Sequence, residues 1–136
     1  MLINRHEAYA PDEVLAVLAP HARFLTQQVG GENEHEWSQW FGRPGEHTGE
    51  GWGRAEAVAQ AEGIGFTVLD SGDAFPRSSF ADVGAVVHYL RLIPWFVPGF
   101  DPTGGDEPAL RDLHARIERD GPLVLRGHRY WFVARP

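Results

Sequence analysis

The chain contains no cysteine and no lysine, so all twelve of its basic residues are arginines. The absence of cysteine excludes disulfides and thiol chemistry. A formal net charge of -7 without a basic cluster argues against nucleic-acid binding. No apolar run approaches the roughly 20 residues that a membrane span needs, and polar residues 4–7 interrupt any signal-peptide core. We therefore expect a cytoplasmic protein without a nucleic-acid or membrane partner.

What the chain does contain indicates a globular fold. Its 136 residues are 43% hydrophobic and include five tryptophans, which suits one domain, residues 1–136, with a real core. Strand-like segments alternate with helix-like ones, and this order predicts an α/β sheet covered by helices. The expected helices cover residues 11–18, 33–41, 54–63, 80–93 and 109–120, and the expected strands cover 2–3, 22–29, 64–70 and 123–135.

Short signals predict where these elements begin and end. Asn33 and Glu36 form a capping-box pair at a helix start, and Ser79 is a candidate cap for the helix over 80–93. Gly127 suggests a bulge in the last strand. Glycine-rich residues 42–53 and the segment SGDAFPRSS (71–79) are both predicted to be loops.

Three segments carry a family resemblance over nearly the whole chain. LINRHEAYAPDEVLAVLAPHARFLTQQVGG (2–31), FADVGAVVHYLRLIPWFVPGF (80–100) and GPLVLRGHRYWFVAR (121–135) together resemble the C-terminal half of class I S-adenosylmethionine-dependent methyltransferases. The resemblance implies a partial Rossmann-like sheet of about four strands with helices on its faces. These would be the family's fourth, fifth, seventh and sixth strands in spatial order, with the last strand of the chain antiparallel.

The family's cofactor-binding features are missing from this sequence. The Gly-rich loop after the first strand and the acidic residue after the second have no counterpart here. The resemblance therefore implies S-adenosylmethionine as cofactor, but with only one wall of its site in this chain. We expect a methyltransferase-like protein that is inactive alone or completed by a partner or an N-terminal segment. The alternative is a non-catalytic module that binds a small molecule or a protein and self-associates.

The candidate site residues lie at expected strand ends and on one helix. His6 is a candidate general base and Arg5 a candidate anchor for an anionic substrate, although both also suit a solvated strand tip. Gln27 and Gln28 either bind substrate or hold the Gly30–Gly31 turn. The full set is His6 and Arg5 as catalytic residues, with Asn4, Gln27, Gln28, His88, Tyr89, Arg91 and Trp95 as substrate-binding residues.

Two further expectations concern metals and partners. His35 and His47 flank acidic residues, but neither has the spacing of a zinc site, so no metal is expected. The short strand at Leu2 and Ile3 is expected to be an open sheet edge, which is a template for pairing with another chain. We therefore expect a homo-oligomer, or a partner that supplies the missing half, and a small-molecule substrate.

Overall fold

The computed structural model describes residues 1–46 and 53–136. Their contacts divide the chain into two compact units. Among the described residues, unit 1 comprises 1–33, 53–75 and 128–136, and unit 2 comprises 34–46 and 76–127. The single domain expected from the sequence stays a prediction.

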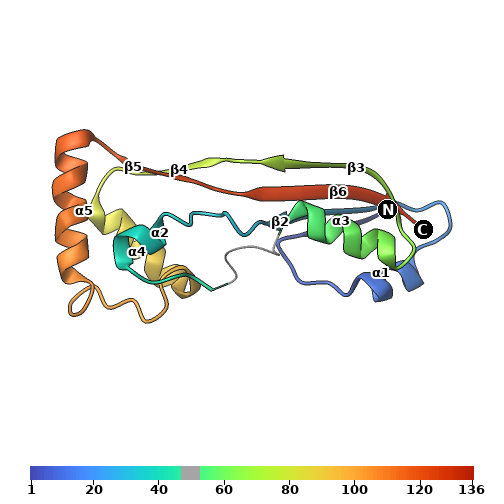
Figure 1. Ribbon diagram of the computed structural model, residues 1–136, viewed down its shortest axis with the longest axis horizontal. Coiled ribbons are helices and arrows are strands. Elements are labelled where there is room, and N and C mark those ends of the chain that lie inside the picture. Colours follow the sequence, from blue (N-terminus) through green and yellow to red (C-terminus); the bar gives the residue numbers. More distant parts are fainter. Residues whose placement is uncertain (47–52) are drawn as a thin grey trace. The chain divides into compact units, whose positions relative to one another are not determined.

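Unit 1 contains a four-stranded mixed sheet (Figure 1). It is built from β1 (Leu2–Arg5), β2 (Phe24–Val29), β3 (Thr67–Ala74) and β6 (Arg129–Arg135), in the spatial order β1-β2-β6-β3. β1 and β2 are parallel, and β6 is antiparallel to both of its neighbours. β3 therefore runs in the same direction as β1 and β2. The predicted α/β class, with about four strands and an antiparallel last strand, is confirmed, and the strands lie in the expected order.

Two helices cover one face of this sheet. α1 (Pro11–Val17) and α3 (Arg54–Gly63) both lie on the same side of the strands in Figure 1. Alternate strand residues point toward them, because successive side chains of a strand face opposite sides. The buried cluster between helices and sheet is made of Val14, Phe24, Ala61, Phe66, Phe132 and Ala134. Within the described part of this unit no helix packs on the opposite face, although the sequence predicted helices on both.

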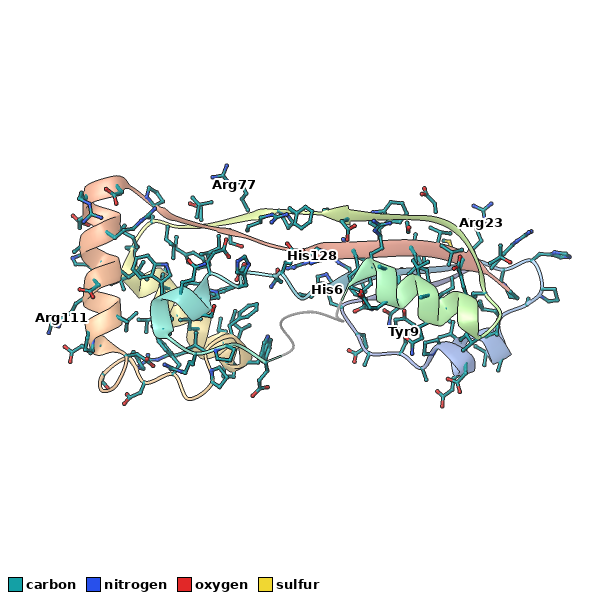
Figure 2. The ribbon with its side chains drawn as sticks, in the orientation of Figure 1. His6, Tyr9, Arg23, Arg77, Arg111 and His128 are labelled. Atoms are coloured by element: carbon teal, nitrogen blue, oxygen red, sulfur yellow. The ribbon has the colours of Figure 1, made fainter. Side chains whose placement is uncertain are left out.

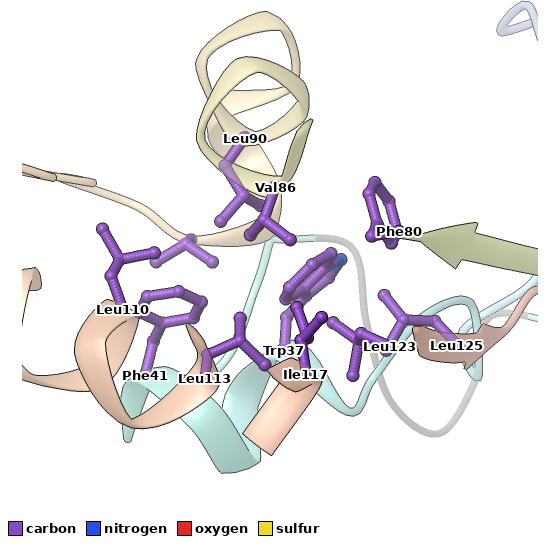
Figure 3. Packing of buried hydrophobic residues seen from close by; sticks show 11 residues of the cluster. Trp37, Phe41, Phe80, Val86, Leu90, Leu110, Leu113, Ile117, Leu123 and Leu125 are labelled. Carbon is purple, nitrogen blue, oxygen red and sulfur yellow. The ribbon is translucent and has the colours of Figure 1, made fainter. Parts of the chain in front are cut away.

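Unit 2 has its own core beneath a small two-stranded sheet. β4 (Arg77–Phe80) pairs antiparallel with β5 (Leu123–Arg126). The surrounding helices are α2 (Trp37–Phe41), α4 (Val83–Leu92), the short 3-10 helix η1 (Pro94–Phe96) and α5 (Glu107–Asp120). Their apolar side chains converge on Trp37, as Figure 3 shows. The buried cluster comprises Trp37, Phe41, Phe80, Val86, Leu90, Val97, Leu110, Leu113, Ile117, Leu123 and Leu125.

The prediction of a loop over 71–79 is wrong. β3 continues to Ala74 and β4 begins at Arg77, so strand structure occupies most of this segment. Its residues, Ser71, Gly72 and Asp73 among them, have low strand propensity. They are extended because they pair with β6, where Ser71 lies opposite Phe132. Long-range pairing therefore overrides local preference in this segment.

The predicted capping box is also wrong. α2 has no side-chain cap. Asn33 Oδ1 instead accepts hydrogen bonds from the His128 backbone N–H at 3.0 Å and from the Arg129 guanidinium. Glu36 Oε1 accepts from the Arg126 backbone N–H at 3.1 Å. Both side chains satisfy polar groups of the distant segment 126–129 in place of the nearby helix end.

Two other boundaries differ from the sequence expectation. The cap of α4 is Asp82, whose Oδ1 accepts from Ala85 N at 2.8 Å, and not Ser79. The single long strand predicted over 123–135 is divided at Gly127 and His128 into β5 and β6, which belong to different sheets. The Gly127 N–H donates to Pro76 O at 2.7 Å at this division.

Part of the predicted loop over 42–53, including His47, lies outside the described residues. Among residues 1–46 and 53–136, no helix has the length and apolar character required to cross a membrane.

Candidate functional site at the carboxyl ends of the parallel strands

Parallel pairing brings several predicted site residues to one edge of the unit 1 sheet. In the β1–β2 register, Asn4 lies opposite Thr26 and Arg5 opposite Gln27. The His6 N–H continues the pairing by donating to Gln27 O at 2.9 Å. Because the carboxyl ends of parallel strands meet at the same edge, Asn4, Arg5, His6 and Gln27 are close neighbours.

The strand alternation divides these residues between the two faces of the sheet. Asn4 Oδ1 accepts hydrogen bonds from Thr26 Oγ1 at 2.9 Å and from Gln28 Nε2, on the face that the helices cover. Arg5 Nε donates to Gln27 Oε1 at 3.1 Å on the opposite face. The sequence predicted one group of side chains, but the period of two along a strand produces two pairs.

Gln28 ties the strand ends together. Its Nε2 also donates to the Glu7 carbonyl at 3.1 Å and approaches Thr26 Oγ1 at 2.9 Å. The Gly30–Gly31 turn is held differently, since the Gly30 N–H donates to the His128 carbonyl at 3.0 Å. In this structure the glutamine side chains therefore do not anchor that turn.

His6 lies immediately after β1 in an unusual backbone conformation. Its φ of 54° is in the left-handed region, which non-glycine residues rarely adopt. Partial desolvation, and then the positive charges of Arg129 and Arg5, lower the pKa of its imidazole. Each of these effects disfavours the imidazolium. At neutral pH His6 is therefore a neutral base able to accept a proton.

Tyr9 packs on the helix-covered face of the sheet, where Figure 2 labels it below the strands. Its ring packs edge-on against Phe24 with centroids 5.1 Å apart. Burial and the nearby Tyr130 raise the pKa of its hydroxyl to about 12, although a hydrogen bond with Thr26 opposes the change. Tyr9 is therefore a protonated hydroxyl throughout the physiological range. The sequence pattern did not single it out.

The carboxyl end of β3 adds a charged network at the same edge. His128 Nε2 lies 3.1 Å from Asp73 Oδ1, and Arg54 Nε lies 2.6 Å from Asp73 Oδ2. His128 Nδ1 faces the Glu32 backbone N–H at 3.4 Å, so we assign the ring proton to Nε2, which donates to the carboxylate. Burial raises the pKa of Asp73, but the bonds from His128 and Arg54 outweigh it and hold that pKa below its ordinary value.

Sequence reasoning missed this network for an identifiable reason. Asp73 lies in the segment predicted to be a loop, and His128 directly follows the glycine predicted to form a bulge. The one local signal of the network is the glycine at position 30. A side chain there would collide with the imidazole, since its Cβ would lie 2.1 Å from His128 Nδ1. Only glycine allows the imidazole to lie against the turn after β2.

The other predicted site residues belong to unit 2. His88 and Arg91 are exposed on α4, and Trp95 is 46% exposed in η1. Tyr89 is half-buried, and its hydroxyl donates to Glu34 Oε2 at 2.8 Å. These four residues belong to unit 2, whereas the strand ends with Asn4, Arg5 and His6 belong to unit 1.

Glu34 is the most unusual buried group of unit 2. The residue is 3% exposed, and its φ of 50° is again left-handed. Besides Tyr89, its carboxylate accepts hydrogen bonds from Ser78 Oγ at 2.6 Å and Trp37 Nε1 at 3.2 Å. Both carboxylate oxygens therefore have hydrogen-bond partners, and the tryptophan indole can only donate. Glu34 also lines a small pocket with His35, Trp37, Ser38, Pro44, Gly45 and Phe96.

Metal binding finds no support in the described ranges. No group of three or more histidine, aspartate or glutamate side chains within 1–46 and 53–136 is arranged to hold an ion. His35 is exposed, and His47 is outside these ranges.

Comparison with known proteins supports the fold alone. No family model matches the chain, and no curated protein matches it in sequence. Among solved structures, the chain is similar to a functionally unknown protein from Deinococcus radiodurans R1. The TM-score is 0.53 at 10% identity, over 98% of this chain and 48% of that one. The chain therefore spans about half the length of this structural neighbour.

Proposed function

We propose that unit 1 forms the substrate-side wall of an S-adenosylmethionine-dependent methyltransferase, with the cofactor contacts completed by another segment or partner. The proposal rests on what lies at the carboxyl ends of β1, β2 and β3. The strands follow the order β1-β2-β6-β3, and this edge of the sheet carries a neutral histidine and amide side chains. Ligands of open α/β sheets bind outside the carboxyl ends of their strands.

His6 has the properties needed for the proton acceptor in this role. Methyl transfer to an O–H or N–H nucleophile requires positioning of the two reactants and removal of a proton. The lowered pKa keeps the imidazole of His6 neutral, and the left-handed backbone turns the residue out of the strand ladder. Arg5, held by Gln27, supplies a fixed positive charge for an anionic substrate group.

NMR titration with S-adenosylhomocysteine tests the proposal. We expect millimolar binding that shifts the amide signals of residues 4–7 and 27–28, because the chain would contribute only part of the pocket. The matched variants are His6→Ala and His21→Ala, since His21 is an exposed histidine of the same unit. Absence of shifts at saturating ligand, or shifts elsewhere, would contradict the proposal.

Calorimetry with S-adenosylmethionine tests whether this chain holds only part of the cofactor site. Micromolar binding by this chain alone would mean that it holds a complete cofactor site, and would overturn the requirement for a partner.

The non-catalytic alternative is favoured by one observation. Asn4, Thr26 and Gln28 satisfy one another, which is how polar side chains stabilise strand ends without a ligand. Thr26→Val discriminates between the two roles. A purely structural cluster predicts lower stability without a change in ligand response, whereas a binding wall predicts that both change.

A further inference from the structure

One face of the unit 1 sheet, on which none of the described helices of this unit packs, carries an apolar row. The register places Ile3 opposite Leu25 on the neighbouring strand, and Leu25 opposite Val133 on the next. Ile3 is 62% exposed, and Leu25 and Val133 are half-buried. Their neighbours along the strands belong to the cluster that faces the helices, so these three side chains point to the opposite side. They therefore form a continuous apolar row across three strands, which we call the open face.

A tryptophan extends the open face toward β3. Trp131 is half-buried and lies opposite Gln27 and Gly72 in the two flanking registers. A Cβ at Gly72 would lie 3.0 Å from the indole ring, so the ring rests against the glycine backbone. An apolar surface with a broad aromatic side chain is typical of interaction sites.

Arginines border the apolar row on both sides along the strands. Arg5 lies opposite Gln27 at one side, and Arg135 lies opposite Thr67 at the other. Arg23 immediately precedes β2, and Figure 2 shows it on the side of the strands away from Tyr9. All three arginines are exposed. Asp70 lies opposite Val133, and it is the one acidic residue among the described strand positions of this face.

The charge pattern decides which occupant fits the open face. Two copies meeting face to face would bring their bordering arginines together, which is unfavourable. A partner with carboxylates beside an apolar stripe would pair with the arginines and cover the row. An apolar sheet face is buried by packing against another element, and an amphipathic helix has the shape and the apolar stripe to do so. We infer that the open face binds an amphipathic helix of another polypeptide whose apolar stripe is flanked by carboxylates.

Two synthetic helical peptides with the same leucine stripe test the inference. One has glutamate on both sides of the stripe, and the other has lysine at the same positions. We expect the glutamate peptide to shift amide signals of β1, β2 and β6 at low salt, and to bind at least tenfold more tightly than the lysine peptide. The preference should weaken as salt rises, because exposed charges are screened.

Charge reversal at the bordering arginines distinguishes electrostatic binding from nonspecific hydrophobic binding. The double variant Arg23→Glu and Arg135→Glu should reverse the peptide preference. Its control, Arg77→Glu with Arg111→Glu, changes the net charge equally at exposed arginines of unit 2 and should leave the preference unchanged. Ile3→Ser, at a side chain that is already largely exposed, should weaken both peptides several-fold without unfolding the sheet.

Three outcomes would overturn the inference. The first is equal binding of the two peptides. The second is loss of the preference in the control variant. The third is concentration-dependent shifts on the open face without peptide, which would assign that face to a second copy. None of the substituted residues belongs to the proposed catalytic edge, so a failure here is distinguishable from failure of the proposed function.

Discussion

His128 Nε2 lies 3.1 Å from Asp73 Oδ1, and this contact joins the carboxyl end of β3 to the segment that leads into β6. Arg54, the first residue of α3, lies 2.6 Å from the other carboxylate oxygen. The Asp73 carboxylate therefore connects two strands and a helix of unit 1. The side chains of His128 and Asp73 are 8% and 25% exposed, so solvent screens this network only in part.

Asp73→Asn should destabilise the protein in a pH-dependent way. At pH 7 we expect a loss of about 1.5–3 kcal/mol, the range for hydrogen bonds to a charged group. The folded-state pKa of Asp73 lies below the ordinary value of 3.8. Its contribution is therefore fully present above that value and disappears as pH falls through the folded pKa. Urea unfolding at pH 7 and near pH 3 measures the difference. Glu62→Gln, at an exposed position of α3, is the control and should have little effect at either pH.

Gly30→Ala should be strongly unfavourable although it adds a single methyl group. The new Cβ would lie 2.1 Å from His128 Nδ1, so the imidazole must leave its position against Phe75 and Asp73. Overpacking of this kind costs about 1–3 kcal/mol. Gly63→Ala is the matched control, because a Cβ at this position of α3 would have no other atom within 4 Å. Thermal unfolding should show a lower midpoint for Gly30→Ala alone; equal midpoints would contradict the packing.

Glu34→Gln should weaken unit 2. The carboxylate accepts from Ser78, Tyr89 and Trp37, whereas a carboxamide would turn an N–H₂ toward at least one of these donors. The Trp37 indole only donates, so an N–H₂ on its side leaves a donor unsatisfied at a cost of about 1–3 kcal/mol, whereas an N–H₂ on the other side requires the Ser78 hydroxyl to reverse and accept. Glu118→Gln, exposed on α5, serves as the control. Urea unfolding monitored by tryptophan fluorescence measures both variants, and equal midpoints would show that the second acceptor oxygen of Glu34 is unimportant.

Tyr9 should ionise late in an alkaline titration followed by ultraviolet absorbance of the phenolate. Its pKa is raised to about 12, mainly by burial, so the folded protein holds this proton above the ordinary value of 10.0. Between these values the unfolded chain releases the proton more readily, and stability should therefore fall as pH rises. Tyr9→Phe should remove the phase near pH 12 and leave the ionisation of Tyr130, whose pKa is also raised, mainly by burial. A phase near pH 12 that persists in the variant would assign it to another tyrosine.

The strand ends of unit 1 show which features local sequence patterns can predict. The apolar residues of segment 22–29 and the polar tip after Ile3 predicted two strands that end in reactive side chains, and the parallel pair β1–β2 agrees. Pro11 with acidic residues after it correctly predicted α1. These signals are local, because helix caps, proline and strand periodicity act within a few residues.

The sites that the sequence missed depend on distant partners. Asp73 is in a strand because β6 pairs with it, and Asn33 bonds to segment 128–129 although its spacing from Glu36 predicted a helix cap. His128 acquires its role from Asp73, 55 residues earlier in the chain. A polar side chain has several possible hydrogen-bond partners, and the local sequence does not show when a distant partner is chosen over a nearby one.

By itself, the sequence determined an acidic, cysteine-free α/β chain, the approximate positions of its main helices, and a polar tip after its first strand. Tertiary structure alone decided that Asn4 bonds to Thr26 and that Arg5 bonds to Gln27. It also decided that His128 bonds to Asp73, and that one sheet face remains open with arginines around Ile3, Leu25 and Val133. The physical reason is that strand register and pairing are long-range: they select which side chains become neighbours only after distant segments have met.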